Sequence, residues 1–525
     1  MRWKLAGAAP ATDAGHHDPV ASLTLIAVAV HLALPWVLGH LPYQDMANHV
    51  ARYTLMDRVW SGVGPPWIRV GLVWSPYIAV DLFGAALVHL FGPHLAVRVM
   101  TTVAIGLPPL GMYRLLRAAA SHARRWTLVA VLLSCSPFLI KGLLNYQIGI
   151  GGALLWLAAW WPRRERPSLG AAACLVLGMG LLFLIHPYAG SFALLVVGVE
   201  ALLSVTADLR SHAGSIWRRQ LGRLSIGAAS GAVAIVLLWQ MQHLGAGDVA
   251  ATIAMRSPLS KLAELTEPFY TFTPWEMVVT VVAYGIAVAA AWQRRSPDAS
   301  SRVFGFATGA LALLYLLTPE RVGGASHLDV RWLIPGLLLI FVAAEEPAEH
   351  RVVSATRALF VACLMHAGII LYFGHRIDHD LDDFDAVRHQ LPPGARVLAV
   401  VGGPHRYGRV EPYLHYALWQ TTETGARVGG LFSYVVAPIG KPPIVSPQFA
   451  HFRELDPPVA LFDPWRNAGS PELPWPVVTQ QYDYILQAGV DADLTSMISV
   501  GACEEQRQEA ITLYHVGACR ARESP

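Results

Sequence analysis

A short polar stretch follows the first long apolar run of the chain. Four side chains in LPYQDMANHVARYTL, residues 41–55, recur at i, i+3, i+4 and i+7: Asp45, Asn48, His49 and Arg52. On a helix this spacing places an acid, an amide, an imidazole and a guanidinium on one face. Such a set can accept a proton and bind an anion. The alternative is the solvated face of a helix on a membrane surface, with Asp45 as its N-cap.

Four more candidate binding residues stand at the ends of other apolar runs: Lys141 and Asn145 in KGLLNYQ, His186 in LIHPY, and Arg331 in LDVRW. Polar groups at the depth of a membrane surface cost free energy unless they are paired or hydrated, so they tend to mark a cavity. Each has a structural alternative. Lys141 can extend to lipid head groups, His186 can cap a helix end, and Arg331 can pair with Asp329.

The remaining acidic residues of these loops give a weaker signal. Glu264 and Glu267 are interpreted as ordinary loop charges, and Asp81 as structural. The sequence contains no CxxC and no Cys/His spacing typical of a metal site. We therefore predict no metal ligands and no firm cofactor.

The composition indicates a membrane protein. Hydrophobic residues make up 54% of the 525 residues and charged residues only 14%, whereas a soluble domain carries about 25% charge. The formal net charge of +3 is too small to indicate a nucleic-acid partner.

Because a helix needs roughly 20 apolar residues to cross a bilayer, the hydropathy pattern predicts eleven transmembrane helices. They are expected at about 21–40, 96–117, 126–142, 147–161, 168–186, 188–206, 223–242, 276–293, 302–318, 331–345 and 352–373. Residues 76–91 contain Asp81 and His89 and are predicted to form an interfacial helix that does not cross.

The arginines between the predicted spans set the orientation, because cytoplasmic loops are rich in Lys and Arg. With residues 1–20 inside, one side of the membrane receives every inter-span arginine cluster: Arg117, Arg124, Arg125, Arg163, Arg164, Arg166, Arg210, Arg218, Arg219, Arg223, Arg294, Arg295, Arg302, Arg351 and Arg357. This orientation places residues 41–95, 243–275 and 374–525 outside the cytoplasm. We expect a multi-pass protein of the plasma (inner) membrane.

The composition changes at about residue 376, where Pro, Gly and charged residues increase. DFDAVRHQLPPGARVLAVVGG indicates a helix, a turn and a buried strand, and YDYILQAG and ITLYHVGAC indicate two more strands. Residues 376–525 are thus predicted to form a small extracytoplasmic α/β domain, following a transmembrane domain at 21–375. Cys503 and Cys519 form a disulfide only if this part is extracytoplasmic.

The order of these features resembles the GT-C superfamily of membrane glycosyltransferases, which includes protein O-mannosyltransferases and lipid A aminoarabinose transferases. QDMANH stands where that group has an acid at the start of a large first outside loop. Two interfacial helices follow; the second ends in the Phe-Gly pair of LFGPHLAVRV, and the third span ends in SCSPFLI. The resemblance covers about residues 20–375.

This resemblance implies transfer of a sugar from a polyprenyl-phosphate carrier to an extracytoplasmic acceptor: a glycan, a lipid or a protein. It implies that Asp45 is the catalytic base and that the anomeric configuration is inverted. Cationic and hydrogen-bonding groups, among them Arg52, Lys141, His186 and Arg331, would stabilise the leaving phosphate.

The sequence departs from the group at one point that bears on activity. Many relatives carry a second acid after the third span, where this chain has Asn145 in KGLLNYQIG. A bound divalent metal is therefore not supported. Two alternatives remain open: a non-catalytic GT-C-like scaffold for cell-envelope assembly, and a lipid-linked glycan transporter.

Overall fold

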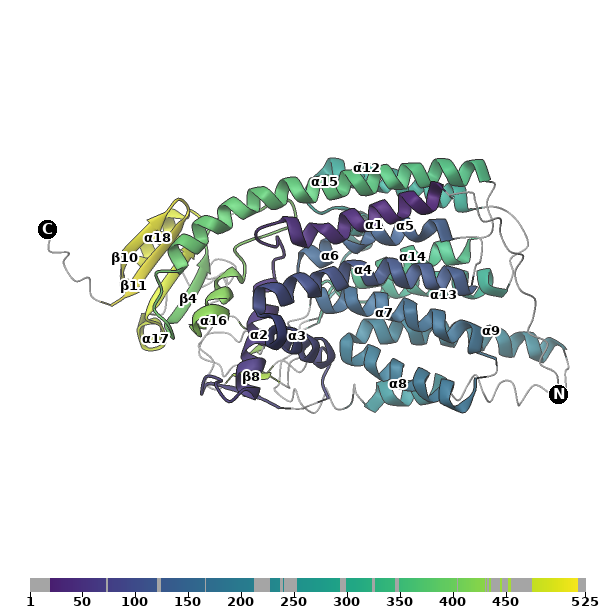
Figure 1. Cartoon of the computed structure of the whole chain (residues 1–525), viewed down its shortest axis with the longest axis horizontal. Coiled ribbons are helices and arrows are strands. Elements are labelled where there is room, and N and C mark those ends of the chain that lie inside the picture. Colours follow the sequence, from purple (N-terminus) through teal and green to yellow (C-terminus); the bar gives the residue numbers. More distant parts are fainter. Residues whose placement is uncertain are drawn as a thin grey trace.

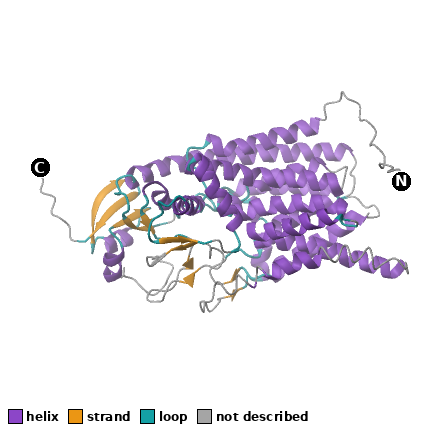
Figure 2. Cartoon of the chain, turned by 60° about the horizontal axis from the view of Figure 1, so that its bottom comes forward, coloured by secondary structure: helices purple, strands orange, loops and turns teal. Residues whose placement is uncertain are grey.

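The fold is described from a computed structural model. It describes residues 19–71, 74–119, 124–165, 167–211, 227–236, 239, 253–292, 299–322, 326–344, 349–403, 405–429, 431, 434–435, 444–445, 452–454 and 475–517. The long apolar helices form one bundle, and the strands gather at one end of it (Figure 1, Figure 2).

Helices make up most of the described chain. They are α1 Pro19–Val37, α2 Met46–Trp60, α3 Ile78–Phe91, α4 Pro93–Ala119, α5 Thr127–Ser134, α6 Pro137–Ile140, α7 Leu144–Trp160, α8 Leu169–Ile185, α9 Pro187–Ser211, α11 Pro258–Glu264, α12 Pro274–Ala291, α13 Ala299–Leu317, α14 Leu333–Ala343, α15 Glu349–Arg388, α16 Trp419–Thr424, α17 Trp475–Gln481 and α18 Ala492–Ile498.

Apolar side chains cover the outside of the bundle as well as its interior. Leu177, Ile286 and Leu316 expose 73%, 45% and 54% of their surface on three different helices. Water would not solvate such faces favourably, whereas lipid would. Within the described residues, five helices are long and apolar enough to cross a membrane, namely α4, α9, α12, α13 and α15, and six shorter apolar helices accompany them. The chain is therefore a polytopic helical membrane protein.

The predicted spans and the helices agree in position, with two differences. The predicted span 126–142 is divided into α5 and α6, because α5 ends before Cys135 and Pro137 starts a new helix. The helix of the last predicted span, α15, does not end near 373 but continues for 15 residues to Arg388. Much of the predicted span 223–242, the loop residues 243–252, and Arg166, Arg218, Arg219, Arg223, Arg294, Arg295 and Cys519 lie outside the described residues.

Two short helices, α2 and α3, lie between the long helices and the strands (Figure 1). Helix α3 has 14 residues, about 21 Å at 1.5 Å per residue, which is shorter than the roughly 30 Å hydrocarbon core. That residues 76–91 do not cross stays a prediction, because the predicted span α14 is shorter still, with 11 residues. A Cβ added to Gly84 of α3 would lie only 2.6 Å from the ring of Tyr53 on α2. Only glycine lets the two helices approach this closely.

The strands predicted in the tail are confirmed, and they join one five-stranded sheet in the order β10-β11-β9-β4-β5. Its strands are β4 Arg396–Val401, β5 Arg427–Val428, β9 Tyr484–Ala488, β10 Ala502–Gln508 and β11 Ile511–Val516. Strand β4 is parallel to β5 and β9, and the other pairs are antiparallel. Cys503 on β10 is disulfide-bonded.

A second contact joins the tail to the first loop. Strand β1, Ile68–Val70, pairs antiparallel with β8, Phe452–Glu454, in the register Ile68 to Glu454. The first loop is therefore paired with residues that are almost 400 positions later in the sequence.

Candidate active site

The carboxylate of Asp45 stands at the start of α2 without capping it. Asp45 occupies the N-cap position, but its side chain accepts no hydrogen bond from the helix. The backbone around it is fixed by a bond from Gln44 N to Ile140 O of 2.9 Å. Gly142, with φ +94°, packs so closely that a Cβ there would lie 2.4 Å from the Asp45 Cβ. The N-cap alternative is therefore not realised, and the carboxylate is held in place by its backbone.

Burial makes Asp45 a base suited to neutral pH. The desolvation of the carboxylate raises its pKa from 3.8 to about 7, although Arg52 and Lys141 act in the opposite direction. The imidazole of His415, from the tail, places its Nε2 3.7 Å from Asp45 Oδ1. The Asp45 side chain remains 18% exposed, so it is not closed off completely from its surroundings.

The other three polar residues of the first loop face one another and an acid on α3. Arg52 is fully buried and donates from Nε and Nη2 to the two carboxylate oxygens of Asp81, at 3.2 and 3.0 Å. It also donates from Nη1 to Asn48 Oδ1 at 3.2 Å. The bidentate pair of Arg52 and Asp81 fixes α2 against α3.

His49 completes that network in a neutral form. Its Nε2 lies 2.9 Å from Gly142 O, so Nε2 donates and Nδ1 is left to accept from Arg52 Nη2 at 3.0 Å. Burial, together with the charge of Arg52, lowers the pKa of His49 to about 3. His49 therefore connects the buried ion pair to the Gly142 turn that supports Asp45.

Arg331 is the cation of this region that has no carboxylate partner within 4 Å among the described residues. It lies in a 3₁₀ turn, Val330–Trp332, with 9% of its surface exposed. Its Nη2 donates to Ser326 O at 3.1 Å, and its Nε is buried without a partner. The guanidinium carbon lies 5.5 Å from the centre of the Tyr188 ring. An arginine with an unused buried donor is suited to bind an anion.

Aromatic rings surround this arginine and connect it to the first loop. His186 lies between Tyr77 and Tyr146, with ring centres 5.2 and 5.4 Å away. Burial raises the pKa of the Tyr77 phenol. Arg331, which hydrogen-bonds to Tyr77, and Arg52 act in the opposite direction. Tyr77 has φ +71°, a conformation that costs a non-glycine residue about 1–3 kcal/mol and often marks a functional site.

His186 has both a structural and a site-facing nitrogen. Its Nδ1 accepts from Tyr188 N at 3.2 Å, so this nitrogen caps the start of α9, as the structural alternative predicts. Its Nε2 faces the Tyr77 hydroxyl at 3.5 Å. On α7, the Oδ1 of Asn145 is buried and lacks a hydrogen-bond partner among the described residues, so Asn145 has an acceptor available for a ligand.

The interpretation of Glu264 and Glu267 as ordinary loop charges is wrong. Glu267 is buried and accepts from Lys141 Nζ at 3.0 Å, so Lys141 does not extend to head groups. Burial acts to raise the Glu267 pKa, but Lys141, Glu264 and His327 lower it to about 2. Burial and the bond with Glu267 raise the pKa of Glu264. Sequence position could not reveal this pairing, because Lys141 precedes Glu267 by 126 residues.

Asp329 also has partners other than the one considered from the sequence. It is 3.3 Å from Arg256 Nε and 3.6 Å from Lys261 Nζ, and it forms no ion pair with Arg331 within 4 Å. These contacts leave Arg331 available. Within the part of the chain that the structure describes, no group of three or more His, Cys, Asp or Glu side chains is arranged to hold a metal ion. The acids near Asp329 are matched by basic groups, so this donor set does not fit a divalent ion.

Comparison with known proteins establishes the fold. No protein-family model and no curated protein sequence matches the chain. Among solved structures, ArnT from Cupriavidus metallidurans in the apo state aligns with a TM-score of 0.52 and 13% identity, over 94% of this chain and 98% of ArnT. The chain has the GT-C fold.

Two further solved structures are similar at a lower score. The arabinofuranosyltransferase AftD from Mycobacteria aligns over 95% of this chain and 42% of its own, with a TM-score of 0.49 and 16% identity. ArnT bound to undecaprenyl phosphate aligns over 94% of this chain and 97% of its own, with a TM-score of 0.47 and 13% identity. At these identities the likeness concerns the GT-C fold and leaves the substrates of this chain open.

Proposed function

We propose that the chain is a membrane glycosyltransferase that moves a sugar from a polyprenyl-phosphate carrier to an acceptor hydroxyl outside the cytoplasm. The observation that carries the proposal is that a GT-C fold presents two groups of opposite charge: an acid suited to act as a base, and a cation with no carboxylate partner among the described residues. Asp45 is a carboxylate with no capping bond and a pKa of about 7, and Arg331 is a buried guanidinium with an unused donor.

Asp45 acts as the general base in this proposal. The acceptor oxygen attacks the anomeric carbon of the donor sugar, and its proton passes to the Asp45 carboxylate. A base whose pKa lies near the working pH combines a high ionised fraction with a strong tendency to take the proton. Because one displacement occurs at the anomeric carbon, the configuration is inverted. The sugar remains on the acceptor oxygen, and Asp45 later returns the proton to water.

Arg331 stabilises the leaving group. As the bond between the anomeric carbon and the phosphate oxygen breaks, the electron pair stays on the phosphate, whose charge increases. The Nε of Arg331 is a buried donor without a partner, and both Arg331 and His186 Nε2 adjoin the Tyr77 hydroxyl. Donors aimed at developing charge lower the barrier. Asn145 Oδ1 is assigned to a sugar hydroxyl.

Arg52, Asn48 and His49 have a different task from the one the resemblance implies. Their side chains are bonded to one another, and Arg52 is bonded to Asp81. We assign them to positioning: they hold the first turn of α2, and with it Asp45, against Gly142. Lys141, bonded to Glu267, contributes a positive charge that keeps part of Asp45 ionised.

The proposal places the site, the first loop 41–95 and residues 376–525 on the extracytoplasmic face of the plasma membrane. The distribution of arginines supports this orientation. Replacing the exposed Ser61 at the end of α2 by cysteine tests it with a membrane-impermeant maleimide on intact cells. Labelling only after lysis would contradict the orientation.

Transfer is tested with the full chain in liposomes and four synthetic donors: undecaprenyl phosphate linked to glucose, mannose, galactose or arabinofuranose. Release of undecaprenyl phosphate is measured by mass spectrometry, with a host envelope fraction as acceptor. We expect Asp45→Asn to abolish release from any donor that is used. The matched control is Asp57→Asn, on the same helix, where the carboxylate contacts the exposed His89. Release by Asp45→Asn at the wild-type rate would refute the role of Asp45.

A further inference from the structure

We propose that His415 is a positioning residue for the Asp45 carboxylate, so that the tail supplies part of the active site. The inference rests on the proposed function, because it concerns the same base. It goes further by assigning a role to a residue of the extracytoplasmic segment, far from the first loop in sequence, which the sequence did not single out.

The geometry brings His415 to one side of the carboxylate. Its Nε2 is 3.7 Å from Asp45 Oδ1, and its side chain is only 8% exposed. The cations that act on Asp45 come from other elements: Arg52 from α2 and Lys141 from the end of α6. The imidazole of His49 faces His415 as well. His415 is thus the group from the tail that adjoins the base.

The backbone of His415 adopts a strained conformation. Its φ is +67°, a left-handed conformation that costs L-residues other than glycine roughly 1–2 kcal/mol. Glycine would occupy this position without that cost. Strain of this kind persists where the surrounding structure imposes it, and it is found at functional sites.

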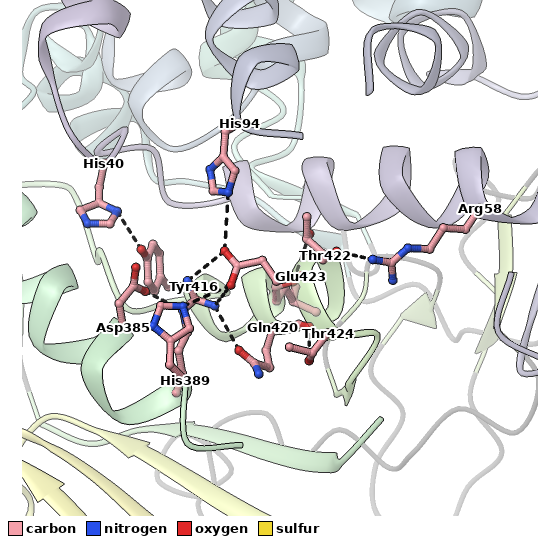
Figure 3. Close-up of polar contacts among 12 residues, drawn as sticks. His40, Arg58, His94, Asp385, His389, Tyr416, Gln420, Thr422, Glu423 and Thr424 are labelled. Atoms are coloured by element: carbon pink, nitrogen blue, oxygen red, sulfur yellow. Dashed lines mark hydrogen bonds and ion pairs between the residues drawn. The ribbon is translucent and has the colours of Figure 1, made fainter. Parts of the chain in front are cut away.

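The segment that carries His415 is bonded to neighbouring parts of the protein through residues that follow His415 (Figure 3). Glu423 accepts two bonds from Arg388, at 2.7 and 3.1 Å. Arg58 of α2 donates to Thr422 O at 2.6 Å, and the Tyr416 hydroxyl lies 2.8 Å from His40 Nδ1. These contacts hold residues 411–424 against α2 and α15, and so fix where the imidazole lies.

The imidazole acts on Asp45 as a neutral hydrogen-bond donor. Burial lowers the pKa of His415 to about 4, so the ring is uncharged at neutral pH. In the tautomer with its proton on Nε2, it can donate to Asp45 Oδ1. The 3.7 Å separation is longer than a hydrogen bond, and such contacts tighten when a substrate binds. The bond favours the ionised carboxylate and leaves Oδ2 for the acceptor hydroxyl.

Carbodiimide labelling with undecaprenyl phosphate bound tests this role, because the site is then occupied but no sugar can be transferred. Dicyclohexylcarbodiimide reacts with protonated carboxyl groups, so labelling of Asp45, measured by peptide mass spectrometry, falls as the pH passes its pKa. In His415→Gly, which keeps the left-handed backbone, the labelling midpoint should rise by about one pH unit, because a hydrogen bond to a carboxylate contributes about 1.5 kcal/mol. Transfer at pH 7 should fall about fivefold and recover near pH 9.

Two further variants separate positioning from packing. His415→Gln places an amide N–H near the position of Nε2 but cannot titrate, so it should restore both the midpoint and the rate. The matched control is His405→Gln, since His405 is a histidine of the same segment that lies 2.8 Å from Asp380, and it should change neither.

The outcomes distinguish this inference from the proposed function. An unchanged midpoint in His415→Gly, or a His415→Gln variant that behaves like His415→Gly, would overturn the role of His415. If Asp45→Asn abolishes transfer in the same experiment, the proposed function stands even though the inference fails. If Asp45→Asn transfers normally, the proposed function fails whatever His415 does.

Discussion

Replacing Asp45 by asparagine should stabilise the folded protein at high pH while it abolishes activity. The pKa of Asp45 is about 7 in the folded protein and 3.8 in an ordinary aspartate. Between these pH values the folded state retains a proton that the unfolded state releases, so the free energy of unfolding falls as the pH rises. Asp45 thus favours the fold below pH 3.8, and this contribution is lost by the time the pH exceeds 7.

The size of the effect follows from the shift. About three pKa units correspond to about 4 kcal/mol at 1.36 kcal/mol per unit. Because 18% of the Asp45 side chain is exposed, water screens part of this cost, and we expect about half of it. Asparagine is neutral at every pH and similar in shape. Asp45→Asn should therefore raise the free energy of unfolding by about 2 kcal/mol at pH 8.5 and change it little at pH 4.

The measurement is unfolding by sodium dodecyl sulfate in mixed micelles, followed by tryptophan fluorescence at both pH values. Asp57→Asn serves as the control because Asp57 lies on the same helix in a less buried position. The decisive quantity is the difference between wild type and variant, since other groups titrate in both. An Asp45→Asn protein that is less stable at pH 8.5, or a difference independent of pH, would refute the reasoning.

Three further perturbations test the neighbouring residues. Gly142→Ala should reduce transfer at least tenfold in a folded protein, because the new Cβ would lie 2.4 Å from the Asp45 Cβ at a φ of +94°; a wild-type rate in the liposome assay would show that Asp45 can move. Asp81→Asn should lower the free energy of unfolding by about 3 kcal/mol, because it leaves the charge of Arg52 buried without its carboxylate. Adding Arg52→Met should recover part of that loss. Additive losses in the same unfolding assay would contradict the pairing. Arg331→Gln should weaken undecaprenyl phosphate binding at least tenfold, as measured by microscale thermophoresis; unchanged affinity would place the phosphate elsewhere.

The sequence predicts the positions of the helices and of the candidate residues better than the contacts those residues make. Apolar runs determine helices in lipid, since each backbone group must be satisfied within the helix, and the described helices lie where the apolar runs predicted them. The break at Cys135 was missed because hydropathy is uniform there and only Pro137 marks it. Asp45 and Arg331 are candidate site residues because each stands at the end of an apolar run.

The partners of these groups could not be predicted from one sequence. Arg52 and Asp81 stand on different helices, and an amphipathic pattern shows which face is polar but not what it meets. Lys141 and Glu267 meet only because the loop before α12 folds back over the end of α6. His415 has no local signal, since HYAL is an ordinary sequence and its contact with Asp45 depends on how the whole tail is seated.

The unbroken length of α15 has a mechanical consequence. Its 40 residues extend for about 60 Å, about twice the thickness of the hydrocarbon core, and the helix reaches from the bundle to the strands (Figure 1). A continuous helix resists bending, so α15 rigidly connects the sheet at its end to the part of the helix that lies in the bilayer. A force applied to the sheet would be transmitted along this helix and tilt it within the lipid.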